Sequence, residues 1–197
     1  MSRNFIYLAS ASPRRRELLR QIGVPFRMIA AGVDESVRPG EAAADYVGRL
    51  AAAKAEAGWR SQQDAPVLAA DTTVILDGAI LGKPAGRQEA LDMLQRLSGR
   101  THEVLTAVAL RSAGGTQVRI SHSSVTFRSI DSDAAAAYWD TGEPRDKAGA
   151  YAIQGGAAVF IAELRGSYSG VMGLPLFETA ELLQAAGVAY WQADHPE

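Results

Sequence analysis

The segment from Leu8 to Leu19 carries the residue types that bind phosphate groups. It contains an apolar run, two serines, a proline, three arginines and an apolar pair with helical spacing. Ser12 can cap a helix whose first residue is Pro13. The free amides of such a helix start, the two hydroxyls and the guanidiniums could converge on one phosphate group. The alternative is a capped surface helix with solvated arginines.

A polar triplet, Asp71, Thr72 and Thr73, interrupts an otherwise apolar run over residues 67–76. An ionised carboxylate in a sheet is costly unless it is paired, bound to a metal or placed at the end of the strand. An aspartate at a strand end with adjacent threonine hydroxyls is a plausible general base or Mg²⁺ ligand, which makes Asp71 a candidate for either role. The alternative is an aspartate that caps a bend or pairs with an arginine.

Three further polar positions could contact a nucleotide. Asp34 and Glu35 offer hard oxygen ligands that suit Mg²⁺ better than zinc, unless they are only a solvated acidic pair. Lys83 lies on a short loop, where it is either a phosphate contact or simply exposed. The side chain of Gln154 carries both a hydrogen-bond donor and an acceptor, and recognition of the edge of a base requires both. Its alternative role is to satisfy neighbouring backbone groups.

Several common sites are excluded by the sequence. The Gly82-Lys83-Pro84 tripeptide lacks the spacing and the hydroxyl residue of a Walker A loop, and no Gly-x-Gly-x-x-Gly follows a predicted strand. The chain has no cysteine and three histidines, so a metal would be bound by oxygen ligands. His102 is interpreted as structural because no serine nucleophile motif accompanies it.

Composition limits the partners. The net charge of -2 and the 21% of charged residues argue against a large nucleic-acid-binding face. No apolar stretch is long enough to cross a membrane and no leader precedes the first strand, so we expect a cytoplasmic protein without membrane contacts.

The hydrophobic pattern predicts alternating strands and helices in a single α/β domain over residues 1–197. A polar loop is expected over 141–147, and Gly58 is expected to end the second helix. Strands are predicted at 5–9, 26–31, 67–76, 80–81, 104–111, 117–128 and 157–164, and helices from 13 toward 23, at 42–58, at 88–97, at 131–139 and from 174 or 175 to 186.

Taken together, these segments resemble the Maf family of nucleoside triphosphate pyrophosphatases. The resemblance runs from Leu8 to about Leu183. Eight short motifs occur in order and at the spacing of the family, which makes chance similarity very unlikely. They lie at residues 9–15, 33–35, 51–55, 70–74, 81–84, 97–102, 146–155 and 166–176.

The resemblance implies a fold similar to that of the inosine triphosphate pyrophosphatases. That fold is a long mixed sheet with flanking helices and two lobes around a central cleft, often in a homodimer. It also implies a reaction that depends on a divalent cation, Mg²⁺ or Mn²⁺. A nucleoside triphosphate and water would give the monophosphate and pyrophosphate.

The resemblance also assigns roles to individual residues. Asp71 matches the proposed general base of the family. Arg14, Thr72 and Gln154 match three positions that separate its subfamilies, with the residue types of the form that prefers dTTP and UTP. We therefore expect Gln154 and Thr72 to read the pyrimidine, with Arg14 near a base oxygen.

The expected phosphate and metal contacts complete this hypothesis. Glu35 is the expected metal ligand, with the metal bridging to phosphate oxygens. Residues expected around the phosphates are Ser10, Ser12, Arg15, Lys54 and Lys83.

Two alternatives remain open from the sequence. The chain could be a nucleotide-binding regulator of septum formation without significant turnover. It could also be a pyrophosphatase for damaged purine nucleotides, against which Gln154 and Arg14 argue only through the resemblance.

Overall fold

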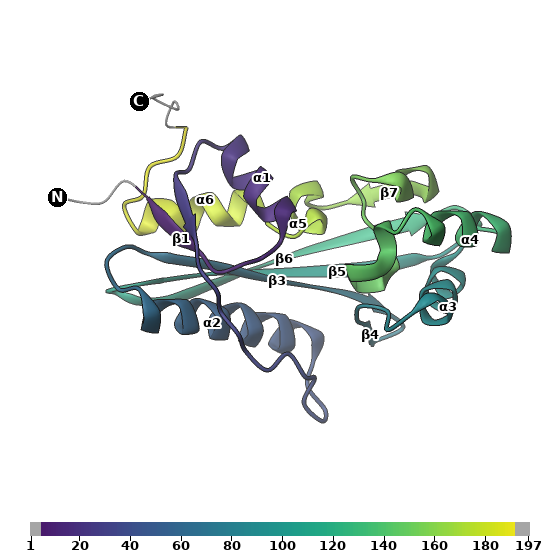
Figure 1. The fold of residues 1–197 in the computed structure, drawn as a ribbon, viewed down its shortest axis with the longest axis horizontal. Helices are drawn as coiled ribbons and strands as arrows, with labels where there is room; N and C mark the ends of the chain where they lie inside the picture. Colours follow the sequence, from purple (N-terminus) through teal and green to yellow (C-terminus); the bar gives the residue numbers. More distant parts are fainter. Residues whose placement is uncertain (1–4, 192–197) are drawn as a thin grey trace. The chain divides into compact units, whose positions relative to one another are not determined.

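The computed structural model describes residues 5–191, in which seven strands form one mixed sheet (Figure 1). The hydrogen-bonded order is β2-β1-β3-β5-β6-β7, and β4 pairs with β3. Strand β1 is parallel to β2 and β3, whereas β4 and β7 are antiparallel to β3 and β6. The predicted α/β class with a mixed sheet is confirmed. The strands are β1 (Ile6–Leu8), β2 (Phe26–Met28), β3 (Val67–Leu76), β4 (Ala79–Leu81), β5 (Thr101–Ser112), β6 (Gly115–Phe127) and β7 (Ile161–Arg165).

Six α-helices and three short 3₁₀ segments accompany the strands within the described residues, and the last two helices follow β7. Most helices begin and end within a few residues of the positions predicted from periodicity. No helix in residues 5–191 has the length and apolar character needed to span a membrane. The helices are α1 (Pro13–Gln21), α2 (Ala43–Ser61), α3 (Arg87–Leu97), α4 (Ser132–Asp140), α5 (Tyr168–Met172) and α6 (Leu176–Ala185), and the 3₁₀ segments are η1 (Glu143–Asp146), η2 (Ala148–Ala150) and η3 (Gly156–Phe160).

The chain divides into two compact units, each built from separate segments. Within the described residues, unit 1 comprises 5–71, 106–121 and 173–191, and unit 2 comprises 72–105 and 122–172. The long strands β3, β5 and β6 each contribute residues to both units. In unit 1, α2 covers one face of the strands, and α1 and α6 cover the other (Figure 1).

Helix α2 continues past Gly58, the residue that was predicted to end it. It runs to Ser61, so that prediction was wrong. Glycine is needed there for close packing. A Cβ atom at Gly58 would lie 2.7 Å from Ile29 Cδ1 and 2.8 Å from Val67 Cγ1. The helix therefore approaches β3 more closely than any larger residue at position 58 would allow.

Unit 2 has its own apolar core, into which α3 and α4 pack side by side. Asp131 caps α4 as predicted, accepting a hydrogen bond of 2.7 Å from the backbone N–H of Ala134. His102 is buried here, in agreement with its structural interpretation. Its Nε2 lies 2.8 Å from the hydroxyl of Tyr151, and its ring meets Tyr151 and Phe127 edge to face.

Two local predictions in unit 2 were wrong in detail. The strand expected from residue 157 starts only at Ile161, because Gly156–Phe160 turns as η3. The polar loop expected over 141–147 contains η1, which follows Gly142 in the left-handed region at φ +79°. Both segments contain turn-forming glycine or proline, whose local preferences outweigh the hydrophobic pattern.

A pair of alanine substitutions on α2 tests the close packing at Gly58. Gly48→Ala should stabilise the protein by up to about 1 kcal/mol, because alanine favours the helix and the new Cβ meets only Ile120 Cδ1 at 3.7 Å. Gly58→Ala should destabilise it by about 1–3 kcal/mol, because buried, β-branched Val67 cannot move away without strain. Chemical denaturation measures both free energies of unfolding. Equal stabilisation by the two variants would contradict the packing argument.

The buried His102 predicts a loss of stability in acid. Burial lowers its pKa from 6.5 to about 4, so between these pH values the unfolded chain binds a proton that the folded chain does not. The contribution of neutral His102 to the free energy of unfolding is therefore fully present above pH 6.5 and is lost as the pH falls toward 4. Between pH 7 and pH 5 the loss is about 2 kcal/mol.

Denaturation of His102→Gln at both pH values measures this contribution. The variant should lose about 2 kcal/mol less than the parent protein between pH 7 and pH 5. The control His122→Gln removes an exposed histidine, and its free energy of unfolding should fall between pH 7 and pH 5 by as much as that of the parent protein. The same loss in His102→Gln as in the parent would show that another group is responsible.

Candidate functional site

Lys54 holds two carboxylates together in unit 1. It lies on α2, and its Nζ is 2.7 Å from Asp71 Oδ1 and 2.7 Å from Glu35 Oε1. Lys54 and Asp71 are 9% and 7% exposed, whereas half of the Glu35 side chain is exposed. The three side chains thus form a charged cluster with a buried end at Asp71 and an open end at Glu35.

Arg15 adds a second cation near these carboxylates. Its Nε donates to the carbonyl oxygen of Gly173 at 2.7 Å, and its Nη1 donates to Ser10 Oγ at 3.2 Å. Burial lowers the pKa of Arg15, and the charges of Asp71 and Glu35 act in the opposite direction. Arginine still keeps its charge at any working pH. The structure therefore brings together five predicted residues, Ser10, Arg15, Glu35, Lys54 and Asp71, with two positive and two negative charges.

Asp71 lies inside the strand that the sequence predicts over residues 67–76, so the strand end is not what makes its charge tolerable. The residue lies in the middle of β3 instead of at an end. The ladder with β1 covers Val67 and Leu68, and the ladder with β4 begins at Val74, so Asp71 lies between the two ladders. The ion pair with Lys54 makes the buried position tolerable, so Lys54 takes the place of the arginine considered from the sequence.

The loop that carries Glu35 is fixed to α2 by two residues that the sequence analysis missed. The Tyr46 hydroxyl donates to the carbonyl oxygen of Glu35 at 3.0 Å, and Arg49 Nη2 donates to that of Ser36 at 3.0 Å. Arg49 also binds both carboxylate oxygens of Glu41 and lowers its pKa to about 2. The only sequence signal was the i, i+3 spacing of Tyr46 and Arg49, which does not identify their partners.

Glu35 and its neighbour Asp34 have separate roles. Asp34 Oδ1 accepts a hydrogen bond of 2.9 Å from the backbone N–H of Ser36, which lowers the pKa of Asp34. Glu35 instead reaches Lys54. Of the acidic pair, Glu35 is therefore the one that belongs to the cluster.

Helix α1 starts where it was predicted to start, but the side chains of Ser12 and Arg14 do not make the expected contacts. Ser12 is the N-cap and Pro13 follows it, yet the Ser12 side chain makes no capping hydrogen bond. Its backbone N–H donates to Ser10 Oγ at 3.2 Å. Arg14 forms an ion pair of 2.9 Å with Glu17 on the same helix. Arg14 is thus not among the residues that the charged cluster brings together.

The remaining predicted residues, Thr72, Lys83 and Gln154, belong to unit 2. Thr72 follows Asp71 in β3, and successive strand side chains point to opposite faces, so the two do not share a face. Lys83 is exposed, and the pKa of Asp146 is lowered mainly by its hydrogen bond with Lys147, with a small contribution from the charge of Lys83. Within residues 5–191 the side-chain amide of Gln154 makes no hydrogen bond, which argues against the role of satisfying backbone groups.

The cluster fits a divalent cation only in combination with a ligand. Within residues 5–191, no three His, Cys, Asp or Glu side chains are grouped to hold a metal ion. Glu35 and Asp71 do offer hard oxygen donors, and Mg²⁺ is commonly bound by one or two carboxylates together with water and substrate phosphates. The donor set therefore fits Mg²⁺ or Mn²⁺ that binds together with a triphosphate, and it does not fit a metal centre made of protein ligands alone.

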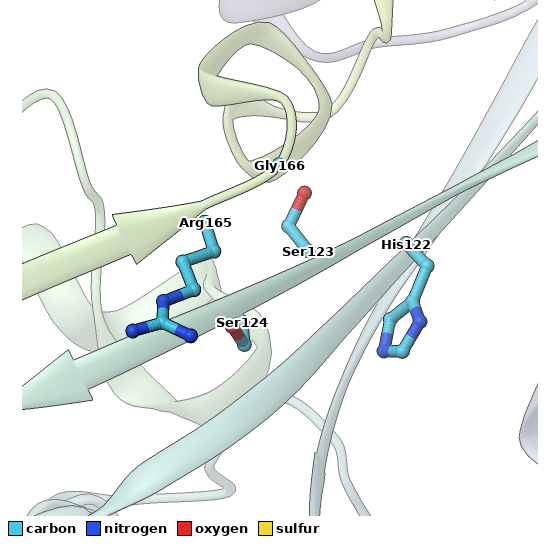
Figure 2. Close-up of a pocket in the computed structure, with 5 residues that line it drawn as sticks. All are labelled: His122, Ser123, Ser124, Arg165 and Gly166. Carbon is cyan, nitrogen blue, oxygen red and sulfur yellow. The ribbon is translucent and has the colours of Figure 1, made fainter.

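A separate hollow of about 260 Å³ lies in unit 2 (Figure 2). Ser123 points toward the turn at Gly166, where a Cβ atom would lie 2.6 Å from Ser123 Oγ. The two basic side chains of the hollow are each paired with a glutamate. None of the predicted site residues lines it. The lining residues are His122, Ser123, Ser124, Arg165 and Gly166.

Comparison with known proteins gives close relatives over nearly the whole chain. The chain is 57% identical to a protein of Aromatoleum aromaticum named dTTP/UTP pyrophosphatase, over 92% of this chain and 95% of that protein. Proteins of the same name are 58% identical in Methylobacillus flagellatus, over 93% and 94%, and 56% identical in Methylococcus capsulatus, over 93% and 91%.

Among solved structures, the Staphylococcus aureus Ham1 protein is similar with a TM-score of 0.44 and 16% identity, over 62% of this chain and 71% of that one. A similarity at this level does not define a shared fold, so the fold class rests on the strand order and helices of this chain.

The model of one protein family matches residues 5–186. That range contains all the residues of the charged cluster and all three predicted residues of unit 2. The family is described as Maf-like protein, and the chain therefore belongs to the Maf family.

Proposed function

We propose that this protein is a nucleoside triphosphate pyrophosphatase that hydrolyses dTTP and UTP to the monophosphate and pyrophosphate. The relatives described above carry the name of this activity. The observation that carries the proposal is the charged cluster, in which one lysine lies within hydrogen-bond distance of both a buried carboxylate and a more exposed glutamate.

Asp71 acts as the general base. Its Oδ1 accepts from Lys54, and it makes no other hydrogen bond among the described residues. Oδ2 can therefore orient a water molecule and take its proton. The water oxygen attacks the α-phosphorus, and the bond to the bridging oxygen of the β-phosphate breaks as pyrophosphate leaves.

The phosphates and the metal are held by the other residues of unit 1. Arg15 and Lys54 supply positive charge, while Ser10 and Ser12 supply hydroxyls at the start of α1. Glu35 is the ligand for Mg²⁺ or Mn²⁺. When bound, the cation neutralises charge on phosphate oxygens and makes pyrophosphate a better leaving group.

Three residues, Arg14, Thr72 and Gln154, select the base. Gln154 presents an amide that can donate to and accept from a pyrimidine edge. Thr72 assists it, Arg14 contacts a base oxygen, and Lys83 binds phosphate. We place this activity in the cytoplasm and in a homodimer.

Pyrophosphate release from a panel of nucleotides tests the proposal. With Mg²⁺, release should occur from dTTP and UTP and be much weaker from CTP, ITP, 7-methyl-GTP and the common purine triphosphates. Asp71→Asn should lower kcat by on the order of 10²-fold or more, because it removes the base while nearly keeping the shape of the side chain. Asp77→Asn, at the exposed turn after β3, is the control and should keep full activity.

Two outcomes would contradict this assignment. Full activity of Asp71→Asn would exclude Asp71 as the base. Nucleotide binding without turnover of any member of the panel would favour the regulator of septum formation.

The metal dependence separates Glu35 from its acidic neighbour. In Glu35→Gln, the Mg²⁺ concentration for half-maximal pyrophosphate release should rise on the order of tenfold or more, because a carboxylate ligand is lost. Asp34→Asn is the matched control and should leave this concentration unchanged, since Asp34 caps its own loop. A similar rise in both variants would indicate a general charge effect instead of a ligand.

A further inference from the structure

The turn that carries Gln154 is held at both ends by one pair of side chains, Tyr138 and Glu143. The backbone N–H of Ala152 donates to the hydroxyl of Tyr138 at 3.1 Å. That hydroxyl donates to Glu143 Oε1 at 2.5 Å, and Glu143 Oε2 accepts from the backbone N–H of Gly156 at 3.1 Å. The two residues thus close a hydrogen-bonded ring around residues 152–156.

The glycine inside this ring shows how closely the carboxylate is seated. A Cβ atom at Gly155 would lie 2.0 Å from Glu143 Oε2 and 2.4 Å from its carboxyl carbon. Gly155 has an extended backbone at φ -110°, so its conformation does not require glycine. The close contact comes from Glu143, whose carboxylate is held by Tyr138 and Gly156 in the space that a side chain would fill.

Tyr138 is a rigid support for this arrangement. It is buried, and its ring meets Phe160 edge to face with centroids 5.5 Å apart. Burial raises the pKa of Tyr138, and the hydrogen bond to Glu143 raises it further. The hydroxyl therefore keeps its proton at working pH, and so it can donate to Glu143 while accepting from Ala152.

Gln154 depends on this support because its own amide makes no hydrogen bond within residues 5–191. Inside the ring, the turn is closed by a hydrogen bond of 3.0 Å from the N–H of Gly155 to the carbonyl oxygen of Ala152. The direction in which the Gln154 side chain leaves the backbone is thus set by the turn, and the turn is set by Tyr138 and Glu143.

We propose that Tyr138 and Glu143 are positioning residues that determine base selectivity by holding the turn of Gln154. This inference rests on the proposed function, in which Gln154 reads the pyrimidine. UTP and CTP are the sharpest pair of substrates, because uracil and cytosine differ at the 4-position, where one presents an acceptor and the other a donor. A looser turn places the Gln154 amide less accurately and weakens this distinction.

The test compares kcat and KM for UTP and CTP in variants with and without Gln154. Tyr138→Phe, which removes only the hydroxyl, should lower the preference for UTP about fivefold to tenfold, mainly through a higher KM for UTP. Glu143→Gln should act in the same direction. In the Gln154→Ala background, Tyr138→Phe should cause no further change of the preference, because the residue through which it acts is absent.

Tyr151→Phe is the matched control. It removes the hydroxyl of another buried tyrosine in the same core, one whose partner is His102 instead of the turn. It should lower stability without changing the preference for UTP over CTP. In Tyr138→Phe, hydrogen exchange at the amides of Ala152 and Gly156 should also be faster than in the parent protein, which tests the ring independently of turnover.

The outcomes separate the two proposals. Absence of pyrophosphate release by the parent protein would contradict the proposed function, and unchanged amide exchange in Tyr138→Phe would contradict the ring. A parent protein that prefers UTP, together with a folded Tyr138→Phe variant of equal preference, would overturn the positioning role alone. An equal loss of preference with and without Gln154 would overturn it as well.

Discussion

The buried ion pair between Lys54 and Asp71 is the constraint on which unit 1 depends. A carboxylate in the middle of an apolar strand is strongly unfavourable without a partner, so α2 must bring Lys54 to 2.7 Å from it. Gly58 lies one helical turn after Lys54 on the same face of α2, where its missing side chain lets the helix approach β3. The glycine and the ion pair are therefore two parts of one packing solution, and the site inherits its rigidity from the core.

Most of the elements, including the strand that contains Asp71, could be predicted because they depend on local pattern. The apolar run of β3, the Asp77-Gly78 turn and the Asp131 cap each act within a few residues. The costly Asp71 also signals that a partner must exist. The identity of that partner does not follow, because Lys54 is 17 residues away and any lysine or arginine would serve electrostatically.

The supports of the site could not be found by such reasoning. Tyr46 acts on the Glu35 loop through a backbone carbonyl, and Tyr138 acts on the Gln154 turn through a backbone N–H. Every residue offers these backbone groups, so the sequence of the supported segment does not indicate its support. Gly155 is an instructive case, since its glycine looks like a turn signal and in fact makes room for the carboxylate of Glu143.

The polar groups of the two units are held in different ways. In unit 1 the cations already have partners, and the Lys54 ammonium uses two of its three N–H donors on Glu35 and Asp71. Glu35 is the easier to release, because it is half exposed and water can replace the lysine. In unit 2 the Gln154 amide makes no hydrogen bond within residues 5–191, and its turn is held by Tyr138 and Glu143. Unit 1 thus presents charged groups that are already paired, whereas unit 2 presents an amide on a turn that is ordered in advance.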